Sequence, residues 1–157
     1  MPTPISERVM AAVAAQLATI TTGNGYSITA NVLRSTRTVT AKQLPAVVLW
    51  DAGESATDSS GASRSMTVTL SLDIVVLVLA EQGDTGTQLE SAKADVKKAL
   101  LSWAQKGVRD DSGHIGPLSY ESATLQPRED GDQSESVSMK FAVTYRESYG
   151  DPTSTTR

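Results

Sequence analysis

The sequence predicts a single α+β domain, in which two helices pack on one face of a sheet of about five strands in mostly antiparallel or mixed order. The helices are predicted by apolar residues that recur every three or four positions in residues 3–20 and 87–103. The sheet is predicted by other segments in which apolar and polar residues alternate. With 157 residues, the chain is long enough to bury a core without a metal or a disulfide.

The first helix is expected over residues 3–20. Thr3 is the expected N-cap, and Pro4 suits the first helical position because its missing N–H group would have no partner there. One stripe of large apolar side chains follows the helical period: Ile5, Val9, Val13, Leu17 and Ile20. Glycine and asparagine in residues 23–25 then predict the end of the helix, since both accept positive φ angles.

Two short strands are expected next. Alternation predicts a half-buried strand over residues 26–32, and residues 44–50 are typical of a short strand that opens with a proline. Residues 51–64 contain no large apolar side chain, so they are expected to form a long loop.

The strongest strand signal lies in residues 65–79. Seven apolar side chains share one face: Met66, Val68, Leu70, Leu72, Ile74, Val76 and Val78. The opposite face begins with hydroxyl groups and becomes apolar over residues 75–79, so the second half is expected to be buried on both faces. An extended segment of this length spans about 50 Å, well beyond the ~15 Å radius of gyration expected for the chain. We therefore expect residues 52–71 to project as a hairpin arm.

The second helix is expected to begin at Thr87, whose spacing to Glu90 suits a capping box. Its apolar face continues to Trp103, and Lys106-Gly107 suits its end. A loop is expected to follow over residues 108–117.

Two further strands complete the expected sheet. One covers residues 118–126, and the other, with clean alternation, covers residues 136–145. A polar turn over residues 127–132 connects them. The folded domain is therefore expected to span residues 1–146, and residues 147–157 are expected to form a flexible tail.

The composition excludes several classes of function. The net charge of −4 argues against the basic face that generic nucleic-acid binding requires. The absence of cysteine excludes disulfides, thiol catalysis and thiolate metal sites. No apolar segment reaches the ~18 residues that a membrane span requires, and no secretory signal is apparent at the N-terminus. A soluble protein inside the cell is the default expectation.

No reaction centre is expected from the residues. His114 is the only histidine, and its glycine-flanked loop would hold a catalytic base poorly. The acidic runs at residues 110–111 and 129–132 lack the spacing of a calcium loop. We therefore expect no catalytic residue, cofactor or metal, and a chain that is not an enzyme. The hydroxyl-rich arm and the open edge of the long strand instead indicate surfaces for partners, and the plainer alternative is flexible loops on a monomer.

Six segments together resemble the layout of a known family. They are the helix that begins Ile5-Ser6-Glu7-Arg8-Val9, the pair Gly25-Tyr26, the strand start Gln43-Leu44-Pro45-Ala46-Val47-Val48-Leu49, the long strand over residues 68–79, the helix that ends near Trp103, and the strand Phe141-Ala142-Val143-Thr144-Tyr145. In this order, over residues 4–146, they resemble the phage tail terminator proteins, which are also called tail completion or minor tail proteins.

The resemblance implies a homohexameric ring that caps the head-proximal end of the phage tail tube, where it ends tube polymerisation and joins the tail to the neck. The implied partners are further copies of the chain, the tail tube protein, a neck or connector protein, and genomic DNA that passes through the bore without specific binding. No membrane partner is implied. The protein is then a virion component of the tail or neck, assembled in the host cytoplasm, and none of its residues is catalytic.

Two groups of residues are expected to serve this role. The arm is expected to contact the neighbouring subunit or the tube through Glu54, Asp58, Arg64, Met66, Val68 and Leu70. Carboxylates that face the DNA channel would repel phosphates and let the genome slide. The candidates for that group are Asp110, Asp111, Glu129, Asp130 and Asp132.

Two alternatives stay open. One is another neck or head–tail joining component, which would use the same ring at a different position. The other, from a different class, is a monomeric α+β binding module or enzyme whose pocket the sequence does not reveal. Oligomeric state separates this second alternative from the ring proteins.

Overall fold

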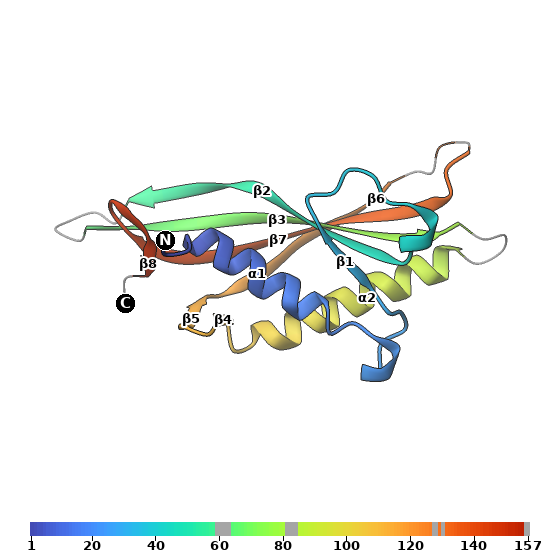
Figure 1. The fold of residues 1–157 in the computed structure, drawn as a ribbon, viewed down its shortest axis with the longest axis horizontal. Helices are drawn as coiled ribbons and strands as arrows, with labels where there is room; N and C mark the ends of the chain where they lie inside the picture. Colours follow the sequence, from blue (N-terminus) through green and yellow to red (C-terminus); the bar gives the residue numbers. More distant parts are fainter. Residues whose placement is uncertain (59–63, 81–84, 127–128, 130, 156–157) are drawn as a thin grey trace.

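Two long antiparallel strands run the length of the molecule in the computed structural model, which describes residues 1–58, 64–80, 85–126, 129 and 131–155 (Figure 1). These strands, β3 (Ser65–Leu79) and β7 (Ser134–Ser148), pair along all fifteen residues of each, from Ser65 opposite Ser148 to Leu79 opposite Ser134. The predicted bounds of the long strand are confirmed, and the second strand is longer than the alternation alone indicates.

The remaining strands extend this central pair into a mixed sheet. In the described residues the order is β1-β2-β3-β7-β6, with β8 beside the end of β7. Only the β1–β2 pairing is parallel. The bounds are β1 (Asn31–Arg34), β2 (Ala46–Asp58), β6 (Leu118–Gln126) and β8 (Asp151–Thr155), and a separate hairpin is formed by β4 (Val108–Asp110) and β5 (Gly113–Gly116).

Both helices lie on one face of this sheet, which confirms the predicted α+β fold. Helix α1 (Ile5–Leu17) buries the predicted stripe, and α2 (Thr85–Ala104) buries Leu89, Val96 and Leu100. They enclose one core with alternate residues of β3 and β7, among which Leu72, Ile74 and Phe141 are fully buried. Neither of these helices is long and apolar enough to cross a membrane.

The helix starts differ from the predictions. The N-cap of α1 is Pro4 rather than Thr3, and the Pro4 side chain makes no capping hydrogen bond. Because α2 already includes Thr85, Thr87 lies inside the helix and Glu90 pairs with Lys93 instead of closing a capping box.

The first predicted strand is largely absent. Only β1 forms, because the backbone before it is held by a helix rather than by a neighbouring strand. The Asp95 carboxylate of α2 accepts hydrogen bonds from the N–H groups of Ser27 and Ile28 at 2.7 and 3.1 Å. Two short 3₁₀ helices, η1 (Thr22–Asn24) and η2 (Ala41–Gln43), flank this region.

The predicted loop and tail instead belong to the sheet. Strand β2 continues to Asp58, which lies opposite Met66 of β3, and residues 147–155 extend β7 and form β8. The arm expected at residues 52–71 is therefore not a free hairpin, because β7 runs beside β3 as far as Ser148. It is the end of a multistranded sheet, and its tip reaches past α1 (Figure 1).

The second half of β3 is not buried on both faces. Val75 and Leu77 are half-buried and Leu79 is 38% exposed, because both helices pack on the other side. The apolar side chains of residues 75–79 on this face are therefore shielded in part by neighbouring strands, because β3 lies between β2 and β7, and not by a helix.

We predict that Gly116→Ala lowers the free energy of unfolding by about 3 kcal/mol, because close packing of β5 on β7 leaves no room for a methyl group. A Cβ atom at Gly116 would lie 1.8 Å from the carbonyl oxygen of Thr144. Gly86 is the matched control: it lies in α2 with open space around it, so Gly86→Ala should stabilise by up to about 1 kcal/mol. Urea unfolding measures both, and equal midpoints would contradict the packing argument.

Candidate interaction surface

The described residues do not assemble a metal-binding cluster. No three of their acidic or histidine side chains gather in a way that could hold a metal ion. His114 lies exposed in β5, and its imidazole occupies the space beside Gly107, where a Cβ would lie 2.2 Å from Nε2. The ring therefore has a packing position on the β4–β5 hairpin, and the surfaces of the sheet are the stronger candidates for function.

The sheet face opposite the helices is rich in hydroxyl groups. Along β3 it presents Thr67, Thr69 and Ser71, and the hydroxyl groups of Thr69 and Thr144 on β7 lie 3.4 Å apart. The neighbouring strands add further small polar side chains on this face: Ser55, Thr57, Ser119, Ser122, Thr124, Ser136 and Ser138. Small polar side chains of this kind can form hydrogen bonds across a contact with another protein surface.

Two strand edges of the sheet are open within the part of the chain that the structure describes. Strand β1 covers β2 only over residues 46–49, so residues 54–58, here called the β2 edge, pair with β3 on one side alone. On the far side of the sheet, β6 is the outermost strand, and its residues 122–126 form the β6 edge. Side chains on both edges are exposed. Open edges of this kind are sites where other chains add strands.

The residues expected at a subunit or tube interface lie together at one end of the sheet, but not all of them reach the surface. Glu54 and Asp58 are exposed on the β2 edge, and Arg64 is exposed just before β3. Met66 is half-buried. Val68 and Leu70 are each 1% exposed and face the core beneath the helices, so in this conformation they do not contact a partner.

Two tyrosines, Tyr145 in β7 and Tyr149 just after it, contact the exposed carboxylates of the β2 edge. The Tyr145 hydroxyl lies 3.5 Å from Glu54 Oε2, and the Tyr149 hydroxyl donates to the Asp58 carboxylate. Burial, followed by the charge of Glu54, raises the pKa of Tyr145, so its hydroxyl remains protonated and able to donate. These contacts tie the β2 edge to the central ladder.

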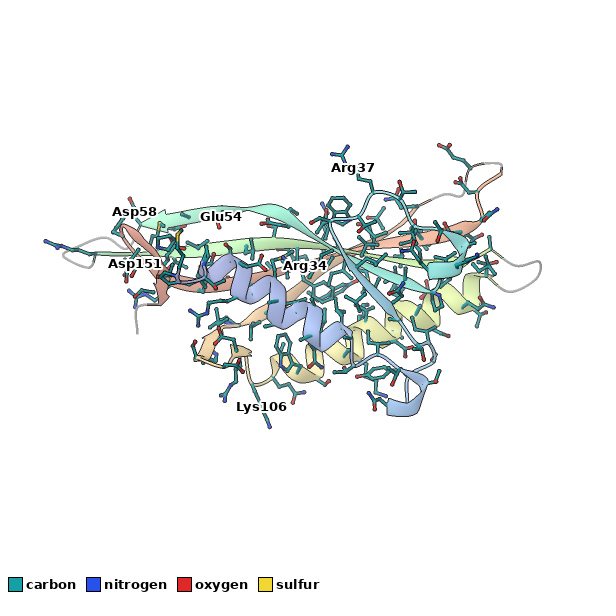
Figure 2. All side chains as sticks on the ribbon, viewed as in Figure 1. Arg34, Arg37, Glu54, Asp58, Lys106 and Asp151 are labelled. Carbon is teal, nitrogen blue, oxygen red and sulfur yellow. The ribbon has the colours of Figure 1, made fainter. Side chains whose placement is uncertain are left out.

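Additional carboxylates make this end of the molecule acidic, a feature that sequence inspection missed. Glu147 of β7 and Asp151 of β8 join Glu54 and Asp58 there, so carboxylates outnumber the cations Arg64 and Arg146, which lie at the same end. Figure 2 places Arg34, Arg37 and Lys106 away from this end. Glu147 is only 9% exposed, and burial, with the charges of Glu54 and Asp151, raises its pKa. Residues 147–157 contain no apolar run, so the sequence gives little signal that Glu147 and Asp151 belong to the sheet.

The carboxylates expected to face a DNA channel do not form one patch. Asp110 and Asp111 lie on the β4–β5 hairpin, whereas Glu129 and Asp132 lie in the β6–β7 connection at the opposite end of the sheet (Figure 1). Asp130 lies outside the described residues. Asp110 forms an ion pair with Arg8 of α1 and accepts the Ser112 N–H at 2.8 Å, so it fastens the hairpin to the helix.

An open groove of about 780 Å³ runs along α1 between Trp103 of α2, the β4–β5 hairpin and Thr153 of β8. Several of its polar side chains have partners inside the chain. Arg8 binds Asp110 and the Thr153 carbonyl oxygen, and the Gln16 amide donates to the Ala99 carbonyl oxygen at 2.9 Å. These contacts join α1 to the β4–β5 hairpin, to β8 and to α2. They engage the Arg8 and Gln16 side chains within the chain, so these two side chains are not free to act on a ligand in the groove.

No family model matches this chain, and no curated protein matches it. The chemistry of the surface indicates what it can do. Two strand edges with open backbone groups can add strands from other chains.

We predict that Asp110→Asn lowers the free energy of unfolding by about 1 kcal/mol at pH 7, because the partly exposed ion pair with Arg8 is lost. The hydrogen bond from Arg8 lowers the pKa of Asp110, so its contribution is present above the pKa of the unfolded chain and is lost as the pH falls through the folded pKa. The two proteins should therefore converge in acid. Asp111→Asn, at the exposed neighbour, is the control and should leave stability unchanged at both pH values.

We predict the opposite sign for Glu147→Gln. A raised pKa means that the folded protein is favoured while this carboxyl is protonated and is penalised as the pH rises through the folded pKa. The glutamine variant should be more stable than the parent by roughly 0.5–1 kcal/mol at pH 7, with little difference near pH 4. Thermal unfolding over this range measures the effect, with exposed Glu121→Gln as control. A loss of stability at pH 7 would show that the charge of Glu147 is needed.

Proposed function

We propose that this chain is a ring-forming phage tail terminator, which caps the head-proximal end of the tail tube, ends tube polymerisation and joins the tail to the neck. The observation that carries the proposal is the end of the sheet where β2 and β3 reach past α1. There the β2 edge offers backbone donors and acceptors to a neighbour over residues 54–58. Such an edge is suited to a contact between subunits.

The order of elements supports the proposal. Helix α1, the strands β1 and β2, the long strand β3, helix α2 and the strands β6 and β7 follow one another as in the family that the sequence resembles. The β4–β5 hairpin is an addition to the expected layout, and it is fastened to α1 by Arg8 and Asp110. A cap on a tube requires shape and interfaces, which the described surfaces offer.

Charge supports a role beside DNA. The chain has a net charge of −4, and Glu54, Asp58 and Asp151 gather at one end (Figure 2). Of the residues expected at the channel, Asp111, Glu129 and Asp132 are exposed candidates, whereas Asp110 is engaged by Arg8. Because Asp111 lies far from the other two, we expect only one of the two groups to face the bore.

We predict that removing the gene for this chain from its phage or prophage yields tail tubes of abnormal and variable length, because tube subunits continue to add when no cap forms. Negative-stain electron microscopy measures the length distribution. Complementation with the parent gene is the control and should restore one length.

The other outcomes decide between the alternatives. Tails of normal length that are detached from heads would assign the chain to a joining position elsewhere in the neck. Normal, infectious particles would overturn a structural role and favour a binding module, for which the groove along α1 is then the first surface to probe.

A further inference from the structure

The two open edges of the sheet carry the same four-residue sequence. Glu54-Ser55-Ala56-Thr57 lies on the β2 edge, and Glu121-Ser122-Ala123-Thr124 leads into the β6 edge. In each strand a register shift lies at the start of this sequence: just before Glu54 in β2, between Asp51 and Glu54, and at Glu121 in β6, between Tyr120 and Ser122. Gly53, with φ +99°, makes the first of these bulges possible. Both edges therefore present short stretches of small side chains after a bend.

The directions of the strands make the two edges complementary. β2, β3, β7 and β6 are successively antiparallel, so β2 and β6 run in opposite directions on the two sides of one sheet. When a second copy is placed beside the first with its helices on the same side, β6 of one copy meets β2 of the next in antiparallel orientation. Such a contact is head-to-tail, and repeated contacts close into a ring when the rotation between copies allows it.

Charge favours this pairing over pairing of two β2 edges. Two antiparallel β2 edges centred on Ala56 would bring Glu54 opposite Asp58 twice, and like charges directly opposite each other are destabilising. With Ala56 opposite Leu125 of a second copy, Asp58 lies opposite Ala123, whereas with Ala56 opposite Ala123, Asp58 meets Glu121 once, so the first register is favoured. Residues 122–126 themselves carry no charged side chain. They include Leu125, whose side chain is 59% exposed and lies on the helix side of the sheet, where a neighbouring strand would cover it.

The geometry points to a sheet that continues from one copy of this chain to the next, through antiparallel pairing of the β2 edge with the β6 edge of a second copy. The pairing deepens the proposed function, because it names the contact between subunits, and it rests on that function only for closure of the contacts into a ring. The faces restrict the register. Ala56, Ala123 and Leu125 lie on the helix side, whereas Ser122 and Thr124 lie on the hydroxyl-rich side. Ala56 must therefore meet residue 123 or 125 of the partner copy.

The absence of cysteine makes a disulfide test clean, since any bond must join the introduced residues. Chains with Ala56→Cys are mixed with chains of a different tag length that carry Ala123→Cys, Leu125→Cys, Ser122→Cys or Thr124→Cys. Opposed residues of antiparallel strands have Cα atoms about 4.5–5.5 Å apart, within the range a disulfide bridges. Residues that point to opposite faces do not meet this requirement.

The expected result is that Ala56→Cys forms mixed dimers with Ala123→Cys or Leu125→Cys at least ten times faster than with Ser122→Cys and Thr124→Cys. The reaction is started by exchange from reducing buffer into air-saturated buffer, with dissolved oxygen as the oxidant, and is followed with purified protein near 1 mM and with particles isolated from complemented phage. Thermal unfolding confirms that each variant folds. Equal rates for all four partners, a product dominated by Ala56→Cys homodimers, or no mixed dimer in either preparation would overturn the pairing.

The test is independent of the proposed function. If gene removal gives abnormal tail lengths but the crosslinks do not depend on the face, the terminator role is supported and the β2–β6 pairing is wrong. Face-dependent crosslinks together with normal tails would establish the pairing and overturn the terminator role. A double variant combines Ala56→Cys with whichever of Ala123→Cys and Leu125→Cys reacts faster. If the ring closes, crosslinking of this variant should give a ladder of covalent oligomers that ends at a fixed number of copies.

Discussion

The ladder between β3 and β7 is the constraint on which the rest of the structure depends. Fifteen residue pairs join residues 65–79 to 134–148, and β2, β6 and β8 all attach to one or the other strand. At about 3.4 Å per residue the ladder spans ~50 Å, whereas the 20 residues of α2 span ~30 Å. The helices therefore leave one end of the sheet, and the hydroxyl-rich part of its second face, uncovered.

Because the helices are shorter than the β3–β7 ladder, the sheet has a covered part, which forms the core, and an uncovered part, whose β2 side chains are exposed. Where α1 and α2 cover it, alternate side chains are fully buried, as at Leu72 and Phe141. Where the sheet reaches past α1, the exposed side chains of β2 are small or acidic and are tied to the ladder through Tyr145 and Tyr149. The same strand thus contributes to the core at residue 49 and to the exposed β2 edge at residue 54.

Sequence patterns predicted the elements whose own residues carry a core-facing period. The stripe of α1, the bounds of β3 and β6, and the alternation in β7 are confirmed, because burial on one face leaves a signature in each segment. The second half of β2 and all of β8 were missed. Their strand conformation comes from pairing with distant residues, and exposed edge strands need no apolar side chains.

The candidate site residues were also predictable only in part. Glu54 and Asp58 were expected at an interface and are exposed, but Val68 and Leu70 were placed there by proximity in the chain although their faces point into the core. Glu147 and Asp151 lie near Glu54 only because the last residues fold into β7 and β8. No apolar period in residues 147–155 predicts these strands. Asp110 was found in a sequence run of acids, yet its partner Arg8 is 102 residues away.

The position of β7 near the end of the chain has a consequence for synthesis on the ribosome. Strand β3 can pair with β2 early, but its other edge stays unpaired until residues 134–148 have emerged, after α2 and β6. The nascent chain therefore carries a long, strongly apolar strand with one open edge for more than a third of its translation, a state in which strands of neighbouring nascent chains can pair wrongly. Early packing of α2 on the face of β3 covers its side chains during this interval but not its backbone, so the open edge of β3 is closed only when β7 has been made.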